Sequence, residues 1–167
     1  LTMFSRNTNL LLAFLRDHNT ARSVLDVFND LYAMFGRETY CRLFPVILTD
    51  RGSEFSNPVP IEQDENDELR SLVFYCNPSA PYQKGGIEVA HELVRRVLPK
   101  GKSFDDLQQE DIDLMLSHIN SYKRGKLNSR SAYQLFNFIY GDDILPKLNI
   151  REIEANDIVL SPKLLKK

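Results

Sequence analysis

The sequence predicts an α/β domain. Short apolar runs alternate with longer segments in which apolar residues recur every three or four positions, the spacing of an amphipathic helix. The chain has 167 residues, of which 43% are hydrophobic and 26% charged, a composition typical of one soluble globular domain. Because helices separate the predicted strands, we expect a mixed sheet covered by helices.

Charge and composition exclude several classes of protein. A net charge of −2 and a pI near 5.9 exclude a uniformly basic nucleic-acid clamp, although they allow a local basic patch. No apolar run approaches the roughly 20 residues that span a bilayer, and the first residues do not resemble a signal peptide. We therefore expect a cytoplasmic protein with no membrane partner. Cys41 and Cys76 are expected to be reduced thiols rather than ligands of a structural zinc.

The first part of the chain predicts a hairpin, a helix and a strand. The apolar runs Leu1–Phe4 and Leu10–Leu15 flank a turn cluster. An apolar stripe with helical spacing follows over Ala21–Phe35, and Gly36 is expected to end that helix. Phe44–Leu48 is a short apolar run that predicts a buried strand.

The middle of the chain predicts one strand and one helix. Val59–Leu69 carries five acidic residues and is interpreted as a weakly structured, solvent-exposed segment that needs no binding partner. Leu72–Tyr75 predicts a strand, and Asn77–Pro81 a loop that leads into a helix over Gln83–Leu98. Pro99 is expected to stop this helix.

The last part predicts two more helices. Ser103–Asp106 resembles a helix-capping arrangement, and apolar residues share one face over Ile112–Tyr122. Lys123–Lys126 is a basic loop before a helix over Ser131–Tyr140. Ile150–Leu160 alternates in hydrophobicity, with no assigned packing partner.

Asp50 and Glu88 are the candidate catalytic residues. Asp50 directly follows a predicted strand, and sites in α/β sheets gather at the carboxyl ends of strands. Taken alone, its Asp-x-Gly pattern favours a turn. Glu88 lies opposite the apolar stripe of its predicted helix, on a polar face with His91, Glu92 and Arg95, and this pattern alone favours a solvated face with ion pairs.

Taken together, the two carboxylates favour a metal site more than either does alone. Mg²⁺ prefers oxygen ligands, and two ions about 3.5–4 Å apart can clamp the attacking and leaving oxygens of a phosphodiester. Such a site needs a third carboxylate, for which the chain offers no good candidate, because Asp17 and Asp26 lie on the wrong elements.

The segments around both carboxylates resemble a known family. Thr49–Phe55 resembles the Thr-Asp-x-Gly-x-Glu-Phe signature around the second acidic residue of DDE transposases and retroviral-type integrases. Asn77–Glu88 resembles the stretch that leads to their third acidic residue. With Arg95-Arg96, Pro99–Gly101 and residues 119–136, the chain is similar to the IS-thirty group of insertion-sequence transposases over roughly residues 1–140.

This resemblance implies an RNase H-like mixed sheet flanked by helices. Asp50 and Glu88 would be the second and third metal-binding carboxylates, with two Mg²⁺ or Mn²⁺ ions in the complete site. The chain opens on what corresponds to the second strand of that fold, so we expect the first strand and its catalytic Asp to be missing. Residues 1–140 would then be an N-terminally truncated catalytic core, and 141–167 a tail of unknown role.

The resemblance also implies a DNA partner. The residues that match polar or basic positions facing DNA are Gln83, Lys84, Arg95, Arg96 and Lys100. Lys102 lies beside this first basic group, and a second basic group is formed by Lys123, Arg124, Lys126 and Arg130. Both groups could bind phosphates in a largely sequence-tolerant way, and ordinary solvated surface is the alternative.

The predicted function is DNA transposition or integration. A DDE transposase, acting as a homo-oligomer, would cleave a phosphodiester and transfer the strand in a metal-dependent reaction. One alternative is a catalytically inactive remnant that binds only DNA or a sister protomer, since one carboxylate is expected to be missing. Another is an RNase H-like nuclease with no strand-transfer step.

Overall fold

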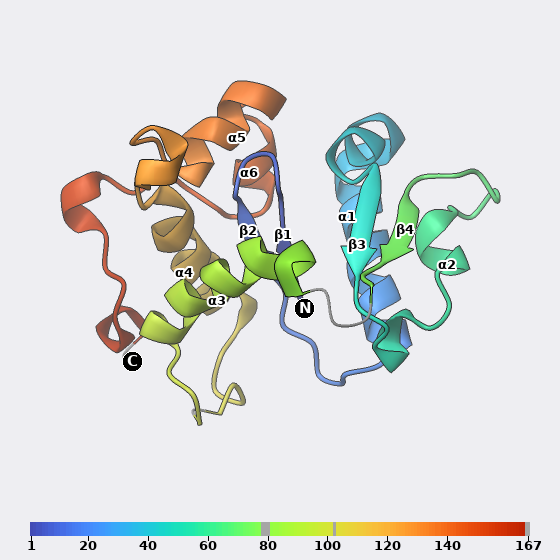
Figure 1. Cartoon of the computed structure of the whole chain (residues 1–167), viewed down its shortest axis with the longest axis horizontal. Coiled ribbons are helices and arrows are strands. Elements are labelled where there is room, and N and C mark those ends of the chain that lie inside the picture. The colour runs from blue at the N-terminus through green and yellow to red at the C-terminus, as the bar shows by residue number, and fades with distance from the viewer. Residues whose placement is uncertain (78–80, 102, 166–167) are drawn as a thin grey trace. The chain divides into compact units, whose positions relative to one another are not determined.

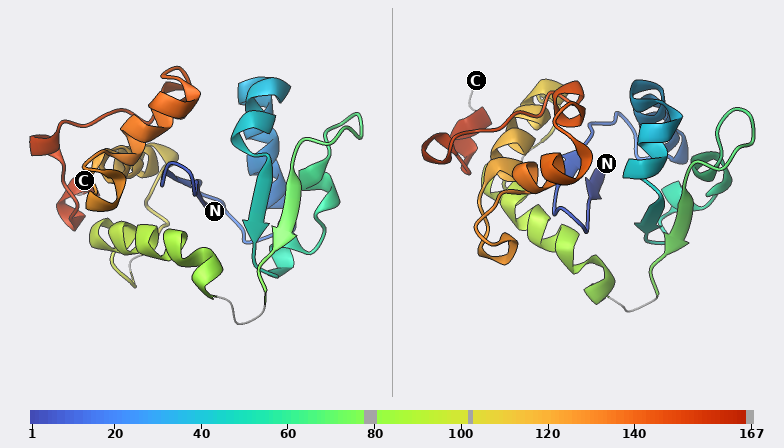
Figure 2. Two further views of the ribbon diagram at one scale, coloured as in Figure 1. Left: turned by 45° about the horizontal axis from the view of Figure 1, so that its top comes forward. Right: turned by 90° about the horizontal axis from the view of Figure 1, so that it is seen from above.

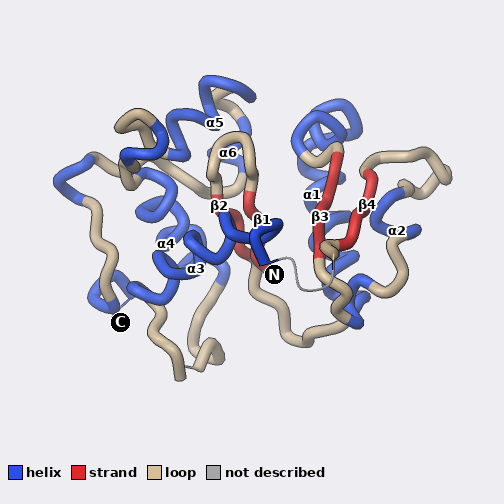
Figure 3. Tube along the Cα trace, in the orientation of Figure 1, coloured by secondary structure: helices blue, strands red, loops and turns tan. Residues whose placement is uncertain are grey.

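The computed structural model describes residues 1–77, 81–101 and 103–165, and the strands within these ranges form two separate pairs (Figure 3). The chain divides into two compact units, Leu1–Leu15 with Lys84–Lys167, and Arg16–Gln83. Each unit combines one pair of strands with helices (Figure 1), which confirms the α/β class. The expected mixed sheet is not formed by the described strands, which pair only two by two, and the RNase H-like fold stays a prediction.

The first unit opens with the predicted hairpin. Strand β1 (Thr2–Phe4) pairs antiparallel with β2 (Leu11–Ala13), with Phe4 opposite Leu11. The N–H of Asn9 donates to the carbonyl of Ser5 at 2.8 Å and closes the turn. Asn9 has a φ of 57°, a left-handed conformation that asparagine tolerates better than most residues.

A buried asparagine anchors β2 to helix α4 (Gln109–Ser121). The backbone N–H of Leu11 donates to Oδ1 of Asn120 at 2.9 Å, and Nδ2 of Asn120 donates to the carbonyl of Leu11 at 2.8 Å. The Asn120 side-chain amide therefore satisfies both backbone groups of Leu11, as a neighbouring strand would.

Four helices complete the first unit: α3 (Gly85–Val97), α4, α5 (Ala132–Tyr140) and α6 (Ile144–Lys147). Helix α3 contacts β1 and α4 contacts β2 (Figure 2). The predicted cap at Ser103–Asp106 is wrong, because Gln108 precedes α4 and forms a capping box with Asp111. Ser131 caps α5 through the N–H of Gln134.

The C-terminal tail packs along α4. The N–H groups of Arg151 and Ile153 donate to the hydroxyls of Ser117 and Ser121, at 3.1 and 2.9 Å. Further along, the N–H of Val159 donates to Nδ1 of His118 at 3.1 Å. The segment Ile150–Leu160, predicted from its alternating hydrophobicity without a packing partner, thus packs against side chains of α4. The functional division into residues 1–140 and 141–167 stays a prediction.

The second unit carries a parallel pair of strands. Strand β3 (Val46–Thr49) runs parallel to β4 (Leu72–Tyr75), with Val46 opposite Leu72. Helix α1 (Ala21–Leu43) has non-helical dihedral angles at Gly36, where φ is 73°. The predicted helix therefore does change at Gly36, but a further helical segment continues to Leu43.

One face of the β3–β4 pair is open. Its apolar side chains, between 38% and 56% exposed, are Val46, Leu48, Leu72 and Phe74. The prediction that Phe44–Leu48 forms a buried strand is therefore wrong for this face. An apolar run does not itself reveal whether both faces of a short strand are covered.

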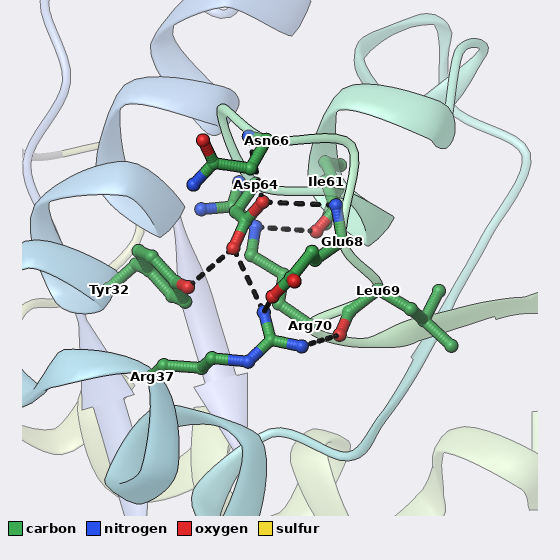
Figure 4. A network of polar contacts seen from close by, with 8 residues as sticks. All are labelled: Tyr32, Arg37, Ile61, Asp64, Asn66, Glu68, Leu69 and Arg70. Atoms are coloured by element: carbon green, nitrogen blue, oxygen red, sulfur yellow. Dashed lines mark hydrogen bonds and ion pairs between the residues drawn. The ribbon is translucent and has the colours of Figure 1, made fainter.

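The predicted solvent-exposed segment over Val59–Leu69 is confirmed for residues 65–69, which are exposed, and is wrong for residues 61–64, which are buried or half-buried. Helix α2 (Val59–Glu62) lies within it and buries Ile61. The side chain of Asp64 is only 4% exposed and accepts hydrogen bonds from the hydroxyl of Tyr32 and from Arg37, at 2.7 and 2.9 Å (Figure 4). The acidic composition of this segment did not indicate that the Asp64 carboxylate attaches it to α1.

Arg70 reinforces the same region from within. Its guanidinium is buried and donates to the carbonyls of Ile61 and Pro60, at 3.1 and 2.9 Å. It also lies over the rings of Tyr32 and Tyr40, at 5.1 and 5.6 Å from their centroids. The start of β4 is thereby tied to both α1 and α2.

Across the described ranges, none of the helices combines the length and apolar character needed to cross a bilayer.

Candidate catalytic site

Asp50 stands where β3 ends. The N–H of Cys76 donates to the carbonyl of Thr49 at 2.8 Å, so the pairing of the two strands continues up to this point. The Asp50 side chain is exposed, and its Oδ1 accepts the N–H of Gly52 at 3.1 Å. The turn proposed as the alternative role for Asp50 is thus present, and it holds the carboxylate at the carboxyl end of the strand.

A second carboxylate folds back over the same turn. The point that a Cβ on Gly52 would occupy lies 2.5 Å from Oε2 of Glu54 and 3.1 Å from Oδ1 of Asp50. Both oxygens therefore converge above the Cα of residue 52. Because Gly52 has ordinary dihedral angles, with φ −59° and ψ 149°, glycine serves here to leave room for Glu54 rather than to adopt an unusual backbone conformation.

The loop that carries these carboxylates is fastened to the sheet. Residues Ser53–Phe55 form one turn of 3-10 helix, and the Phe55 side chain is buried. The hydroxyl of Tyr75, the last residue of β4, donates to the carbonyl of Phe55 at 2.5 Å. The Asp50–Phe55 loop is thus held at both ends by the β3–β4 pair.

Glu88 lies in the first turn of α3 and is exposed. Ala90, Leu93 and Val97 form the buried stripe of this helix, which confirms the predicted orientation of Glu88 away from the core. A carboxylate in the first turn also interacts favourably with the helix dipole.

Contacts with β1 fix the rotation of α3. The hydroxyl of Thr2 and Nε2 of His91 lie 2.9 Å apart in a hydrogen bond. A Cβ on Gly86 would fall on the ring of Phe4, so the glycine allows the ring to pack against the first turn. His91, predicted to share the solvated face, is instead half-buried.

The first group of predicted DNA contacts is only partly exposed to solvent. Arg95, Arg96 and Lys100 are exposed. Gln83 accepts the N–H of Asn77 through Oε1 at 2.8 Å and so supports the preceding loop. The side chain of Lys84, all of Lys102 and residues 78–80 of the predicted motif lie outside the described residues.

The second group combines one anchoring residue with exposed cations. The guanidinium of Arg124 donates to the carbonyl of Ile119 at 3.4 Å, and its burial lowers the pKa of Arg124. Lys123, Lys126 and Arg130 are exposed. We therefore expect Arg124 to shape the loop and its neighbours to meet a ligand.

Carboxylate oxygens that could bind a hard cation are present at the ends of β3 and α3. Asp50 and Glu54 belong to the second unit and Glu88 to the first. Among the described residues, no three His, Cys, Asp or Glu side chains are grouped so that they could hold a metal ion. Convergence of Asp50 and Glu88 on Mg²⁺ stays a prediction. Sequence reasoning missed Glu54, although its place in the Thr49–Phe55 motif was the available signal.

Known proteins share parts of this sequence. A predicted integrase, ORF3 of Spiroplasma virus SpV1-R8A2 B, is 30% identical over 120 residues, which are 72% of this chain and 35% of the relative. The transposase for insertion sequence element IS1086 of Cupriavidus metallidurans is 35% identical over 63 residues, 38% of this chain and 19% of the relative. Transposase InsI for insertion sequence element IS30A of Escherichia coli is 27% identical over 63 residues, 38% of this chain and 16% of the relative.

The chain thus spans about a third or less of the length of these relatives. No family model matches it, and neither does any solved structure.

Proposed function

The chain belongs to a family of integrases and insertion-sequence transposases, and on this premise we propose that it forms part of a catalytic core that cuts and joins DNA. Asp50 and Glu88 are its metal-binding carboxylates in this proposal. The observation that carries it is the pair of carboxylate oxygens, from Asp50 and Glu54, that converge over Gly52 at the end of a strand.

In this proposal the carboxylates supply oxygen ligands for the metal. Bound Mg²⁺ would polarise the phosphate and lower the pKa of a coordinated water. Asp50, held by the N–H of Gly52, offers its carboxylate at a fixed position at the sheet edge. Glu54 adds negative charge beside it, which favours a divalent cation at that position. Glu88, in the first turn of α3, is the other metal-binding carboxylate of this proposal.

Exposed cations would bring the DNA to these groups. Arg95, Arg96 and Lys100 follow Glu88 at the end of α3 and beyond it, and they can neutralise phosphates without reading sequence. This arrangement predicts binding that weakens steeply as salt concentration rises.

A strand-transfer assay tests the proposal. The chain is incubated with a duplex that has recessed 3′ ends, a supercoiled plasmid and Mg²⁺ or Mn²⁺, and joined products are counted. We expect any joining to depend on both carboxylates, with a loss of about 100-fold or more in Asp50→Asn and Glu88→Gln, the range seen when an essential electrostatic group is removed. Glu92→Gln, an exposed carboxylate on the same helix, is the matched control and should join normally.

The other outcomes separate the alternatives. DNA binding with neither cleavage nor joining would overturn the proposal in favour of a non-catalytic DNA-binding protein. Cleavage without joining would instead indicate a nuclease.

A further inference from the structure

The loop between α4 and α5 is strongly basic in a chain of net negative charge, and α5 itself carries no charged residue. Between Asp113 and Asp142 the sequence contains four basic residues and no acidic ones, whereas the whole chain has a net charge of −2. The basic side chains are Lys123, Arg124, Lys126 and Arg130. Asp113 does not offset them at the surface, because it is buried and accepts a hydrogen bond from Gln109 at 2.7 Å.

The loop has a defined shape. The N–H of Arg124 donates to the carbonyl of Arg130 at 3.1 Å, so the two residues form an isolated antiparallel bridge that closes the loop. A turn of 3-10 helix over Gly125–Leu127 fills it, and Asn128 and Ser129 both have positive φ. Lys123 and Lys126 are exposed on a fixed scaffold as a result.

Beside this loop lies the exposed aromatic ring of Phe138. Phe138 on α5 is 80% exposed, the largest exposure among the large hydrophobic side chains of the described residues. Phe136, two positions earlier and therefore on another face of the helix, is buried and fills the core. Phe138 thus contributes little to the packing of its own unit.

Arg130 joins the ring to the basic loop. Its guanidinium carbon lies 5.9 Å from the centroid of the Phe138 ring, within the range of a cation–π contact. An exposed ring under a guanidinium, next to further cations, is the combination with which proteins bind unpaired nucleotides: the bases stack on the ring and the cations meet the phosphates.

We propose that Phe138, Arg130 and the loop Lys123–Lys126 form a binding site for single-stranded DNA, in which Phe138 stacks on an unpaired base. The proposal rests on the proposed function in taking DNA as the partner. It adds a DNA-binding site to the metal-binding role proposed for Asp50 and Glu88. The exposed cations favour DNA as the occupant, because an apolar protein partner would cover Phe138 without needing positive charge beside it.

Fluorescence anisotropy in EDTA tests this site independently of catalysis. A labelled single strand and a duplex of equal length are each titrated with the full chain. We expect Phe138→Leu to weaken binding of the single strand by about 5- to 100-fold, the range for loss of one base–aromatic stack, and to change duplex binding little. Phe138→Trp should retain binding, because the ring is replaced by another ring.

Phe104→Leu is the matched control. Phe104 is 55% exposed but is flanked by Asp105 and Asp106, so its loss should leave both affinities unchanged. Replacing Lys123 and Lys126 by Gln should weaken binding to both DNAs. It should also flatten the salt dependence for the single strand by about 0.7 for each phosphate that the protein no longer neutralises.

Two results would overturn the site. In one, Phe138→Leu binds the single strand as tightly as the unmodified protein. In the other, the variant changes only the oligomeric state in sedimentation, which would make Phe138 part of a protein interface. Neither result depends on strand transfer, so a failure of this site and a failure of the proposed function remain distinguishable.

Discussion

The hydroxyl of Tyr32 donates a 2.7 Å hydrogen bond to Oδ2 of Asp64, which lies 32 residues further along the chain (Figure 4). Two backbone N–H groups, of Asn66 and Glu68, donate to the other oxygen of the same carboxylate, at 2.9 and 3.1 Å. Because these groups bind the ionised form, the hydrogen bond from Tyr32 first and the backbone N–H groups after it hold the pKa of Asp64 below its ordinary value of 3.8.

This pKa shift predicts how stability depends on pH. The folded protein releases the Asp64 proton more readily than the unfolded chain does. The stabilisation that ionised Asp64 gives the folded state is therefore fully present above pH 3.8 and is lost as the pH falls through the folded pKa. We expect Asp64→Asn to lower the urea midpoint at pH 7 and to lower it by less at pH 3. An equal difference at both pH values would contradict this role.

Asn120 gives a prediction for the core of the first unit. Asn120→Ala would leave the buried N–H and carbonyl of Leu11 without partners, at a cost of about 2–4 kcal/mol in the free energy of unfolding. Chemical denaturation measures the loss, and the exposed Asn156→Ala is the control. A change below about 0.5 kcal/mol, the usual size for a surface substitution, would mean that the pairing contributes little.

His118 makes attachment of the tail sensitive to pH. Burial, together with the nearby charge of Arg151, lowers the pKa of His118, while Asp157 acts in the opposite direction. The neutral ring accepts the N–H of Val159, and a protonated Nδ1 cannot. The unfolded chain binds this proton more readily, so stability falls as the pH drops below 6.5.

Hydrogen exchange of the Val159 amide checks this prediction. After correction for the intrinsic rate, protection should be weaker at pH 5 than at pH 7.5 in the unmodified protein. In His118→Gln, which can accept a hydrogen bond without titrating, protection should be the same at both. A pH-independent amide in the unmodified protein would show that protonation does not release the tail.

Gly52 is predicted to set the position of Glu54. A methyl group in Gly52→Ala would lie 2.5 Å from Oε2 of Glu54, so the carboxylate must move away, while the backbone can stay as it is. We expect weaker Mn²⁺ binding in calorimetry with an unchanged urea midpoint. Gly125→Ala, where a Cβ meets nothing within 4 Å, is the control and should bind Mn²⁺ normally. Unaltered Mn²⁺ affinity in Gly52→Ala would remove Glu54 from the site.

Much of the fold could be predicted because local patterns decide it. The hairpin, the apolar stripe of α3 and the helix predicted over Ser131–Tyr140 each depend on residues close together in the chain. The orientation of Glu88 followed from the same helical spacing.

The errors come from contacts between distant residues. Asp64 was predicted to be solvated because its neighbours are acidic, yet Tyr32 and Arg37 of α1 bind it. Neither the exposed face of β3 nor the packing of the tail on Ser117 and Ser121 has a local signature, since both depend on what covers an element. Glu54 was overlooked for a different reason, because its meeting with Asp50 depends on the missing Cβ of Gly52.

Calorimetric titration with Mg²⁺ or Mn²⁺, of the unmodified chain and of the double variant Asp50→Asn with Glu88→Gln, tests directly whether these two residues bind metal. We expect saturable binding to the unmodified chain and its loss in the double variant. An identical titration of both proteins would contradict the assignment of Asp50 and Glu88 as metal-binding carboxylates.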